Sequence, residues 1–207
     1  MTPLQLDDLR ADLAIIQRWI EPGSQVLDLG CGEGMLLRYL REHKQVRGYG
    51  LEINQERITT AIAQGVNVIE QDLNKGLVNY NDGSFDTVVM AQAIQAVQRP
   101  DQLLDEMLRV GQEAIITFPN FGYWRTRVYL ALKGEMPMSE TLPHSWYNTP
   151  NIHLCTVTDF EKLCADKNIR ILNKTVLDDS HQEHWAIRLW PALLGEMAIY
   201  HLTRRPL

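Results

Sequence analysis

Closely spaced glycines constrain the fold of this chain more than any other part of its sequence. Gly30, Gly32 and Gly34 alternate with other residues just after Asp28. The run follows an apolar β-type segment and precedes a helical stretch. Glycine lets the backbone turn tightly and approach a ligand without a Cβ clash, and the next helix presents free amides at its N-terminus. The run therefore predicts a strand, a tight turn and a helix that together hold a ligand.

Short β-type runs alternate with helical stretches along much of the chain. The predicted strands are Gln25 to Leu29, Val46 to Glu52, Val66 to Asp72, Phe85 to Met90, Glu113 to Phe118, Ile169 to Leu177 and Glu196 to Thr203. The helices between the first five lie near Met35 to His43, Asn54 to Gln64 and Asp101 to Arg109. Strands separated by single helices pair in parallel through right-handed crossovers. The pattern predicts an α/β protein with a doubly wound sheet.

Two segments fall outside this alternation. Apolar residues at helical spacing predict an amphipathic N-terminal helix over residues 1–21. Residues 120–157 form an insertion rich in aromatic residues and proline, and a capping box of Thr158 and Glu161 is predicted to start the helix that follows it. With 207 residues and 45% hydrophobic composition, residues 1–207 are expected to form a single domain.

The charge of the chain argues against a nucleic-acid partner. Lys and Arg total 20 against 26 for Asp and Glu, and the net charge of -6 provides no general attraction to phosphate. The sequence has no run of ~20 apolar residues that would predict a membrane span, and no membrane partner is expected. The 3 cysteines form no Cys-x-x-Cys pair, which favours reduced thiols, no metal site and a cytoplasmic location.

The residues around the glycines favour an organic cation over a dinucleotide. A dinucleotide-binding loop has Gly or Ala where this chain has Met35, because that position packs the helix against the strand. Asp28 lies two residues before the first glycine, where a carboxylate would repel a pyrophosphate. The same carboxylate favours an organic cation or a network of water.

Acidic residues at the ends of three predicted strands complete a candidate cofactor site. Glu52 ends the second strand, where a carboxylate can accept hydrogen bonds from both ribose hydroxyls. Asp72 ends the third strand, where a carboxylate can accept from an adenine amino group. Ligands of such sheets bind in the crevice at the carboxyl ends of the strands. The candidate cofactor-binding residues are Asp28, Gly30, Cys31, Gly32, Gly34, Glu52, Asp72, Leu73 and Gln92, and no catalytic residue is assigned.

These residues resemble the first motif of the class I S-adenosylmethionine-dependent methyltransferases, acidic-x-Gly-x-Gly-x-Gly. The likeness covers approximately residues 1–120. The whole chain is similar to one family in particular, the methionine biosynthesis protein MetW. That similarity rests on residues 26–34, on residues 92–97 after the fourth strand, on residues 118–122 and on residues 146–153.

The resemblance implies a Rossmann-like methyltransferase fold with a seven-stranded sheet, an antiparallel C-terminal strand, and S-adenosylmethionine or S-adenosylhomocysteine as ligand. It also implies a role in methionine biosynthesis together with homoserine O-acyltransferase as a protein partner. The chain has no Gly-x-Ser-x-Gly nucleophile elbow, so acyl transfer is expected of the partner. The alternative is an autonomous methyltransferase that acts on a small molecule. The three acids argue against a third possibility, a scaffold that has lost ligand binding.

Further interpretations concern residues outside the candidate site. His153 is interpreted as a hydrogen-bonded tie between the insertion and the core rather than as a general base. His181 and His184 have no recognised metal-ligand spacing. Trp185 and Trp190 either cover the sheet edge or anchor a protein partner, because aromatic residues are common anchors of protein contacts.

Overall fold

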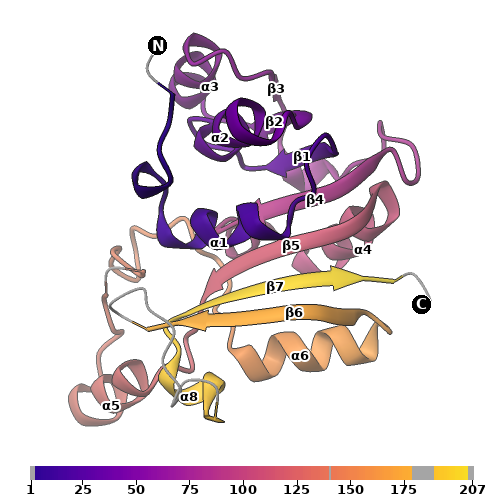
Figure 1. Cartoon of the computed structure of the whole chain (residues 1–207). Helices are drawn as coiled ribbons and strands as arrows, with labels where there is room; N and C mark the ends of the chain where they lie inside the picture. The colour runs from indigo at the N-terminus through magenta and orange to yellow at the C-terminus, as the bar shows by residue number, and fades with distance from the viewer. Residues whose placement is uncertain (1–2, 140, 179–188, 205–207) are drawn as a thin grey trace.

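The computed structural model describes residues 3–139, 141–178 and 189–204 (Figure 1). The strands are β1 (Gln25–Leu29), β2 (Arg47–Glu52), β3 (Val68–Glu70), β4 (Phe85–Ala91), β5 (Gly111–Pro119), β6 (Arg170–Leu177) and β7 (Met197–Thr203). The α-helices are α1 (Ala11–Trp19), α2 (Met35–Lys44), α3 (Gln55–Ala63), α4 (Pro100–Val110), α5 (Trp124–Lys133), α6 (Val157–Asp166) and α8 (Pro191–Leu194). Three short 3-10 helices are η1 (Leu6–Asp8), η2 (Leu73–Lys75) and η3 (Ile94–Ala96).

All seven strands belong to one sheet with the order β3-β2-β1-β4-β5-β7-β6. The first five strands in this order pair in parallel with their neighbours. β7 lies between β5 and β6 and runs antiparallel to both. Chain order reverses between β1 and β4, so their carboxyl ends form the switch point at which such sheets bind ligands. The predicted α/β sheet and its antiparallel C-terminal strand are confirmed.

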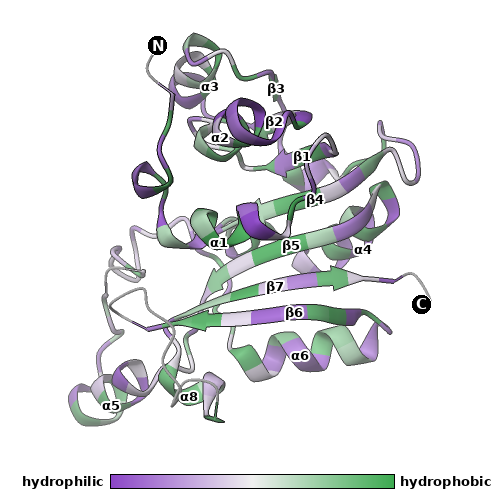
Figure 2. Ribbon diagram, viewed as in Figure 1, coloured by the Kyte–Doolittle hydropathy of each residue, from purple (hydrophilic) through white to green (hydrophobic). Residues whose placement is uncertain are grey.

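Helices cover both faces of the sheet, because successive strand residues point to opposite sides. Val26 packs in a core with residues of α1, α2 and α3, whereas Leu27 packs in a second core with residues of α4 and α6. Figure 2 shows that the outward side of α2 is hydrophilic. Its inward side buries Leu36, Leu37 and Leu40, which fixes the start of α2 against the sheet.

The sequence interpretation missed α5 and the short α8, and it misplaced one cap. The aromatic insertion contains α5, which lies beyond the carboxyl end of β5 (Figure 1). The capping box predicted for Thr158 and Glu161 is wrong, because Thr156 caps α6 by accepting a hydrogen bond from the amide of Asp159 at 3.1 Å. The carboxylate of Glu161 instead accepts hydrogen bonds from Lys174 at 2.5 Å and from the hydroxyl of Tyr200 at 2.9 Å.

Two elements are shorter than the sequence predicted. β3 contains three residues rather than the seven that were expected. The N-terminal helix is confined to α1, and the segment before it is extended except for η1. Within the described residues, no helix is long and apolar enough to cross a membrane.

Candidate cofactor site

A cavity of about 790 Å³ opens at the carboxyl ends of β1, β2 and β4. Distant parts of the chain contribute to its wall. They include the segment before α1, the loop between β1 and α2, the segments that follow β2, β3 and β4, and the insertion after β5. Eight of the nine candidate cofactor-binding residues line it, namely Asp28, Gly30, Cys31, Gly32, Glu52, Asp72, Leu73 and Gln92. The volume lies within the range that small-molecule sites occupy in proteins.

Gly34 is the candidate that does not line the cavity. It caps α2 in the left-handed conformation, with φ of 79°. A Cβ at this position would lie 3.0 Å from the side chain of Val66. Gly34 therefore lets the chain turn into α2 while the backbone packs closely against Val66. A side chain at this position would be strained by the positive φ and would clash with Val66.

The glycine loop is held in place by backbone hydrogen bonds to the adjacent strand. The amides of Gly30 and Cys31 both donate to the carbonyl oxygen of Leu51, at 2.7 Å and 3.1 Å. Gly50 makes room for this arrangement, because a Cβ there would lie 2.2 Å from the Cys31 sulfur. The loop thus packs directly on β2, and two of its amides are already satisfied within the protein.

Glu52 fixes the loop through a second set of contacts. One carboxylate oxygen accepts a hydrogen bond from the amide of Gly32 at 3.0 Å. The other accepts from the amides of Ile53 at 2.8 Å and Asn54 at 2.9 Å. A carboxylate offers about four acceptor positions. Glu52 therefore keeps room for about one further donor, while it connects β1, β2 and the start of α3.

Asp28 is a buried carboxylate at the base of the cavity. Only 3% of its surface is exposed, and none of the described residues donates a hydrogen bond to its carboxylate. Burial raises its pKa from 3.8 to about 7, and the nearby charge of Arg10 partly offsets the increase. Ionised Asp28 is therefore short of a partner, and a cation in the cavity would supply one.

Asp72 reaches the cavity from the turn after β3. One of its carboxylate oxygens accepts from the backbone amide of Asn74 at 2.9 Å and from the side-chain amide at 3.0 Å. The side chain of Asn74 in turn accepts from the amide of Gln98 at 2.8 Å. These contacts fix Asp72 by one oxygen and leave the other available to a ligand.

Gln92 lies at the end of β4 in an uncommon backbone conformation. Its φ is 56°, in the left-handed region that favours glycine. Its amide donates to the carbonyl and the hydroxyl oxygens of Thr117, both at 3.0 Å. Its side-chain amide donates to Asp12 at 3.2 Å. Gln92 therefore borders the cavity and also ties α1 to the end of the sheet.

Asp12 and Arg10 are site residues that the sequence interpretation missed. Asp12 is 1% exposed and also accepts from the hydroxyl of Thr117 at 3.2 Å. Arg10 lines the cavity and pairs with both oxygens of Asp12, at 3.1 Å and 2.9 Å. An acid on the buried side of an amphipathic helix was the available signal, because such a residue requires a partner.

The cysteines of the described structure are free thiols. Cys31 lines the cavity. A position before a helix can lower the pKa of a thiol, but burial raises the pKa of Cys31. Cys31 is therefore a packed loop residue and not an activated nucleophile. The part of the chain that the structure describes contains no cluster of three His, Cys, Asp or Glu residues suited to a metal ion.

His153 ties the insertion to the rest of the protein, as predicted. Its amide donates to the carbonyl oxygen of Gln95 at 3.1 Å, and its ring Nε2 lies 3.2 Å from the carbonyl oxygen of Gln98. The insertion places Thr141, His144 and Asn151 in the cavity wall, so residues far from the glycine loop in the sequence also line the site. His181, His184 and Trp185 lie outside the described residues.

The sheet order, the glycine loop after β1 and the acids at the strand ends define a protein with the fold of the S-adenosylmethionine-dependent methyltransferases. Within this class, the chain belongs to the MetW family. The family model described as methionine biosynthesis protein MetW matches residues 10–202.

A curated relative supports the same family. The bifunctional methionine biosynthesis protein MetXA/MetW of Rhodopirellula baltica is 37% identical over 183 residues. The match covers 84% of this chain and 29% of the relative. The chain therefore spans less than a third of the length of that relative.

Solved structures share the fold at low sequence identity. An S-adenosylmethionine-dependent methyltransferase from Archaeoglobus fulgidus superimposes with a TM-score of 0.69 at 15% identity, over 96% of this chain and 94% of that one. Phosphoethanolamine N-methyltransferase 2 of Haemonchus contortus, in complex with S-adenosyl-L-methionine, gives a TM-score of 0.63 at 14% identity, over 94% and 52% of the two chains. At these identities the similarity shows the fold alone.

Proposed function

We propose that the cavity binds S-adenosylmethionine or S-adenosylhomocysteine. The observation that carries this proposal is the placement of Asp28, Glu52 and Asp72 along one wall of a cavity of about 790 Å³. Each acid lies at or just beyond the carboxyl end of a different strand, next to a glycine loop. This spacing suits an extended ligand that has several hydrogen-bond donors and a positive charge.

The order of the strands gives the direction of the ligand. Asp72 accepts from the adenine amino group at the β3 end, and the remaining acceptor position of Glu52 receives a ribose hydroxyl at the β2 end. The amino-acid end then lies beside Asp28, at the ends of β1 and β4. The ligand ammonium supplies the charge that the buried Asp28 carboxylate lacks.

A dinucleotide fits the same wall poorly. Its pyrophosphate would lie against the glycine loop, where the amides of Gly30, Cys31 and Gly32 already donate within the protein. It would also face the carboxylate of Asp28. Isothermal titration with S-adenosylhomocysteine and with NAD tests this choice, and heat from NAD alone would contradict it.

The role proposed for the liganded chain is that of a subunit that acts with homoserine O-acyltransferase in methionine biosynthesis. Support comes from the curated relative, whose name joins MetXA to MetW in one longer protein. The family resemblance implies that the joined component is the acyltransferase. A cytoplasmic location is consistent with three free thiols.

The surface beyond β5 offers anchors for such a partner. Trp190 is 61% exposed, and Trp146 and Tyr147 of the insertion are 73% and 77% exposed. α5 carries hydrophobic and hydrophilic residues around its circumference (Figure 2), and of its residues only Thr126 is buried. Large exposed aromatic residues are common anchors of protein interfaces.

The test is the rate of acyl transfer from an acyl-CoA to homoserine, measured with the acyltransferase alone and with this chain added. A change in rate together with co-elution of the two proteins is expected, and Trp190→Ala should weaken co-elution without weakening ligand binding. Absence of both co-elution and a rate change would refute the partnership. Methyl transfer to a small molecule by the chain alone would favour the autonomous methyltransferase instead.

A further inference from the structure

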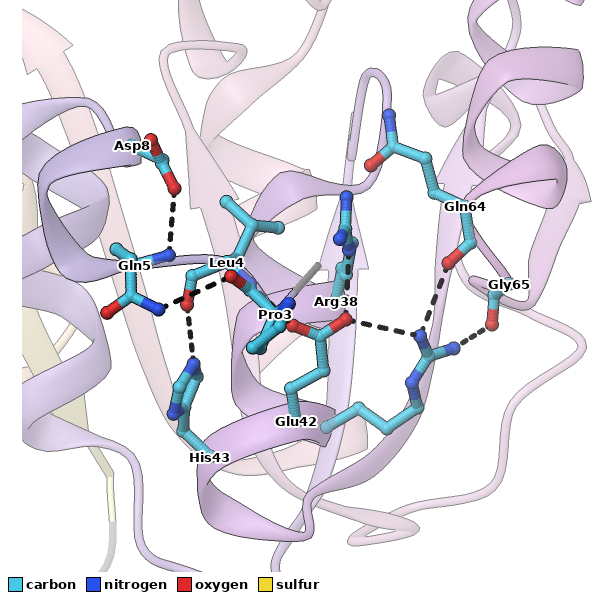
Figure 3. Close-up of polar contacts among 10 residues, drawn as sticks. Pro3, Leu4, Gln5, Asp8, Arg38, Glu42, His43, Gln64 and Gly65 are labelled. Carbon is cyan, nitrogen blue, oxygen red and sulfur yellow. Dashed lines mark hydrogen bonds and ion pairs between the residues drawn. The ribbon is translucent and has the colours of Figure 1, made fainter. Parts of the chain in front are cut away.

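The segment that precedes α1 borders the cavity and is fixed at both of its ends. We call residues 3–10 the N-terminal arm. At its start, the amide of Leu4 donates to Glu42 at 2.8 Å, and the carbonyl oxygen of Leu4 lies 2.6 Å from Nε2 of His43 (Figure 3). Arg38 donates to the same Glu42 at 2.9 Å. The arm is thus attached to α2, the helix that carries the glycine loop.

At its other end, the arm is attached to the sheet through Asp12. The guanidinium of Arg10 donates to the two carboxylate oxygens of Asp12 through Nε and Nη2. Asp12 is itself held by Gln92 and Thr117 at the ends of β4 and β5. These contacts orient the plane of the guanidinium and fix its place beside the cavity.

Arg10 keeps donors available for a ligand. Its side chain is 54% exposed and lines the cavity. Nη1 donates to none of the described residues, so the edge formed by Nη1 and Nη2 can still meet a carboxylate. Because the buried Asp12 fixes one edge of the guanidinium, the other edge is oriented for a second, bidentate contact.

The charges around the cavity make such a cation necessary for a zwitterionic ligand. The acidic residues of its wall are Asp8, Asp28, Glu33, Glu52 and Asp72. Against these five acids, the arginines of the wall are Arg10 and Arg57. A ligand carboxylate next to the acids alone would be repelled, and the arginines are the permanently charged cations of this wall.

The position of the two arginines decides between them. Arg57 lies on α3, which follows β2 and leads to β3, the side proposed for ribose and adenine. Arg10 is joined to the ends of β4 and β5, on the opposite side of β1. The charge of Arg10 also acts on Asp28, which places the two groups within electrostatic reach.

We propose that Arg10 binds the carboxylate of the ligand's amino-acid end, while the ammonium of the same end faces Asp28. This inference rests on the proposed function and adds a specificity determinant outside the glycine motif. The site then recognises the intact amino acid of the ligand through the positive charge of Arg10 and the negative charge of Asp28. A nucleoside that lacks the carboxylate loses the contact with Arg10 and retains the others.

The test compares S-adenosylmethionine with decarboxylated S-adenosylmethionine, which keeps the ammonium, sulfonium and nucleoside. Isothermal titration is carried out on the wild-type chain, on Arg10→Gln and on Arg57→Gln as the matched control. The wild type should bind S-adenosylmethionine about 10- to 100-fold more tightly than the decarboxylated compound, the range expected of a charged hydrogen-bond pair. Arg10→Gln should remove most of this preference, and Arg57→Gln should retain it.

The outcomes separate this inference from the function on which it rests. If the wild type binds both compounds equally, or if Arg10→Gln keeps the full preference, the assignment to Arg10 is wrong although the cavity still binds the ligand. If the wild type binds neither compound, the proposed function fails and the inference fails with it. Arg10→Lys keeps the positive charge but cannot make the bidentate contact, so its preference for S-adenosylmethionine over the decarboxylated compound should be intermediate. This variant replaces Arg10→Gln in the test if Arg10→Gln does not fold.

Discussion

Replacement of Asp28 by asparagine is expected to stabilise the unliganded protein while it destroys the site. Burial penalises the ionised form of Asp28 and raises its pKa from 3.8, the ordinary value of an aspartate, to about 7 in the folded protein. Between these two values the folded state binds a proton that the unfolded state has released. The free energy of unfolding therefore falls as pH rises from about 4 to about 7.

The magnitude follows from the size of the shift. About three units at 1.36 kcal/mol each give a loss on the order of 4 kcal/mol at pH 8 relative to pH 4, from this group alone. In Asp28→Asn this loss is absent, although a buried amide without partners costs about 1 to 3 kcal/mol. A net gain of about 1 to 3 kcal/mol remains at pH 8, or roughly 2 to 10 °C in melting temperature.

Scanning calorimetry at pH 5 and pH 8 tests this prediction. The variant should melt above the wild type at pH 8. The advantage should be absent at pH 5, because the loss from Asp28 is there only about 1 to 2 kcal/mol and the cost of the buried amide offsets it. Asp166→Asn removes an exposed carboxylate and reports the effect of net charge alone. An Asp28→Asn protein that is no more stable than wild type at pH 8 would show that the reasoning on burial is wrong.

Three further predictions concern the loop and the thiols. Glu52→Gln should lower the free energy of unfolding of the unliganded protein by about 2 to 4 kcal/mol. The three backbone amides donate to both carboxylate oxygens, and a glutamine amide has only one oxygen that can accept. An unchanged melting temperature would contradict this prediction. Gly50→Ala should displace Cys31 and reduce ligand affinity, measured by titration, since its Cβ would lie 2.2 Å from the sulfur. Burial raises the pKa of Cys155 to about 12 and of Cys164 to about 11, so Ellman's reagent at pH 8 should react slowly with the native protein and rapidly in urea; fast native labelling would refute this.

The sheet could be predicted because the local pattern and the global fold agree. β1, β4, β5 and β7 each contain a short apolar run, and the glycine loop marks the point where the first strand ends and a helix begins. The acids at the strand ends could be found for the same reason, since the carboxyl ends of parallel strands meet at one edge. The hydrogen bonds from backbone amides to Glu52 and Asp72 could not be predicted, because every residue except proline has a backbone amide and the sequence does not show which of them donate.

The parts that could not be predicted depend on contacts between distant residues. Asp12 is 80 residues from Gln92 and 105 from Thr117, and a single sequence does not indicate such pairs. The cap of α6 was misplaced because two overlapping frames, one starting at Thr156 and one at Thr158, both place an acid three residues later. The contacts of Glu161 with β6 and β7 leave only the first frame available.

The large exposed side chains of α5 explain why that helix escaped the periodicity argument. Val128 is 44% exposed and Leu132 is 79% exposed, so its apolar residues do not mark a buried stripe. A helix without one buried face has no pattern of period 3.6 that a sequence can display.

The melting temperature of the chain with and without S-adenosylhomocysteine tests the proposed cofactor site most directly. A ligand that binds only the folded state at 100 times its dissociation constant adds ~2.7 kcal/mol. For a chain of 207 residues this corresponds to a rise of roughly 5 to 10 °C, and NAD should give no comparable rise. Stabilisation by NAD without stabilisation by S-adenosylhomocysteine or S-adenosylmethionine would contradict the assignment of the cavity.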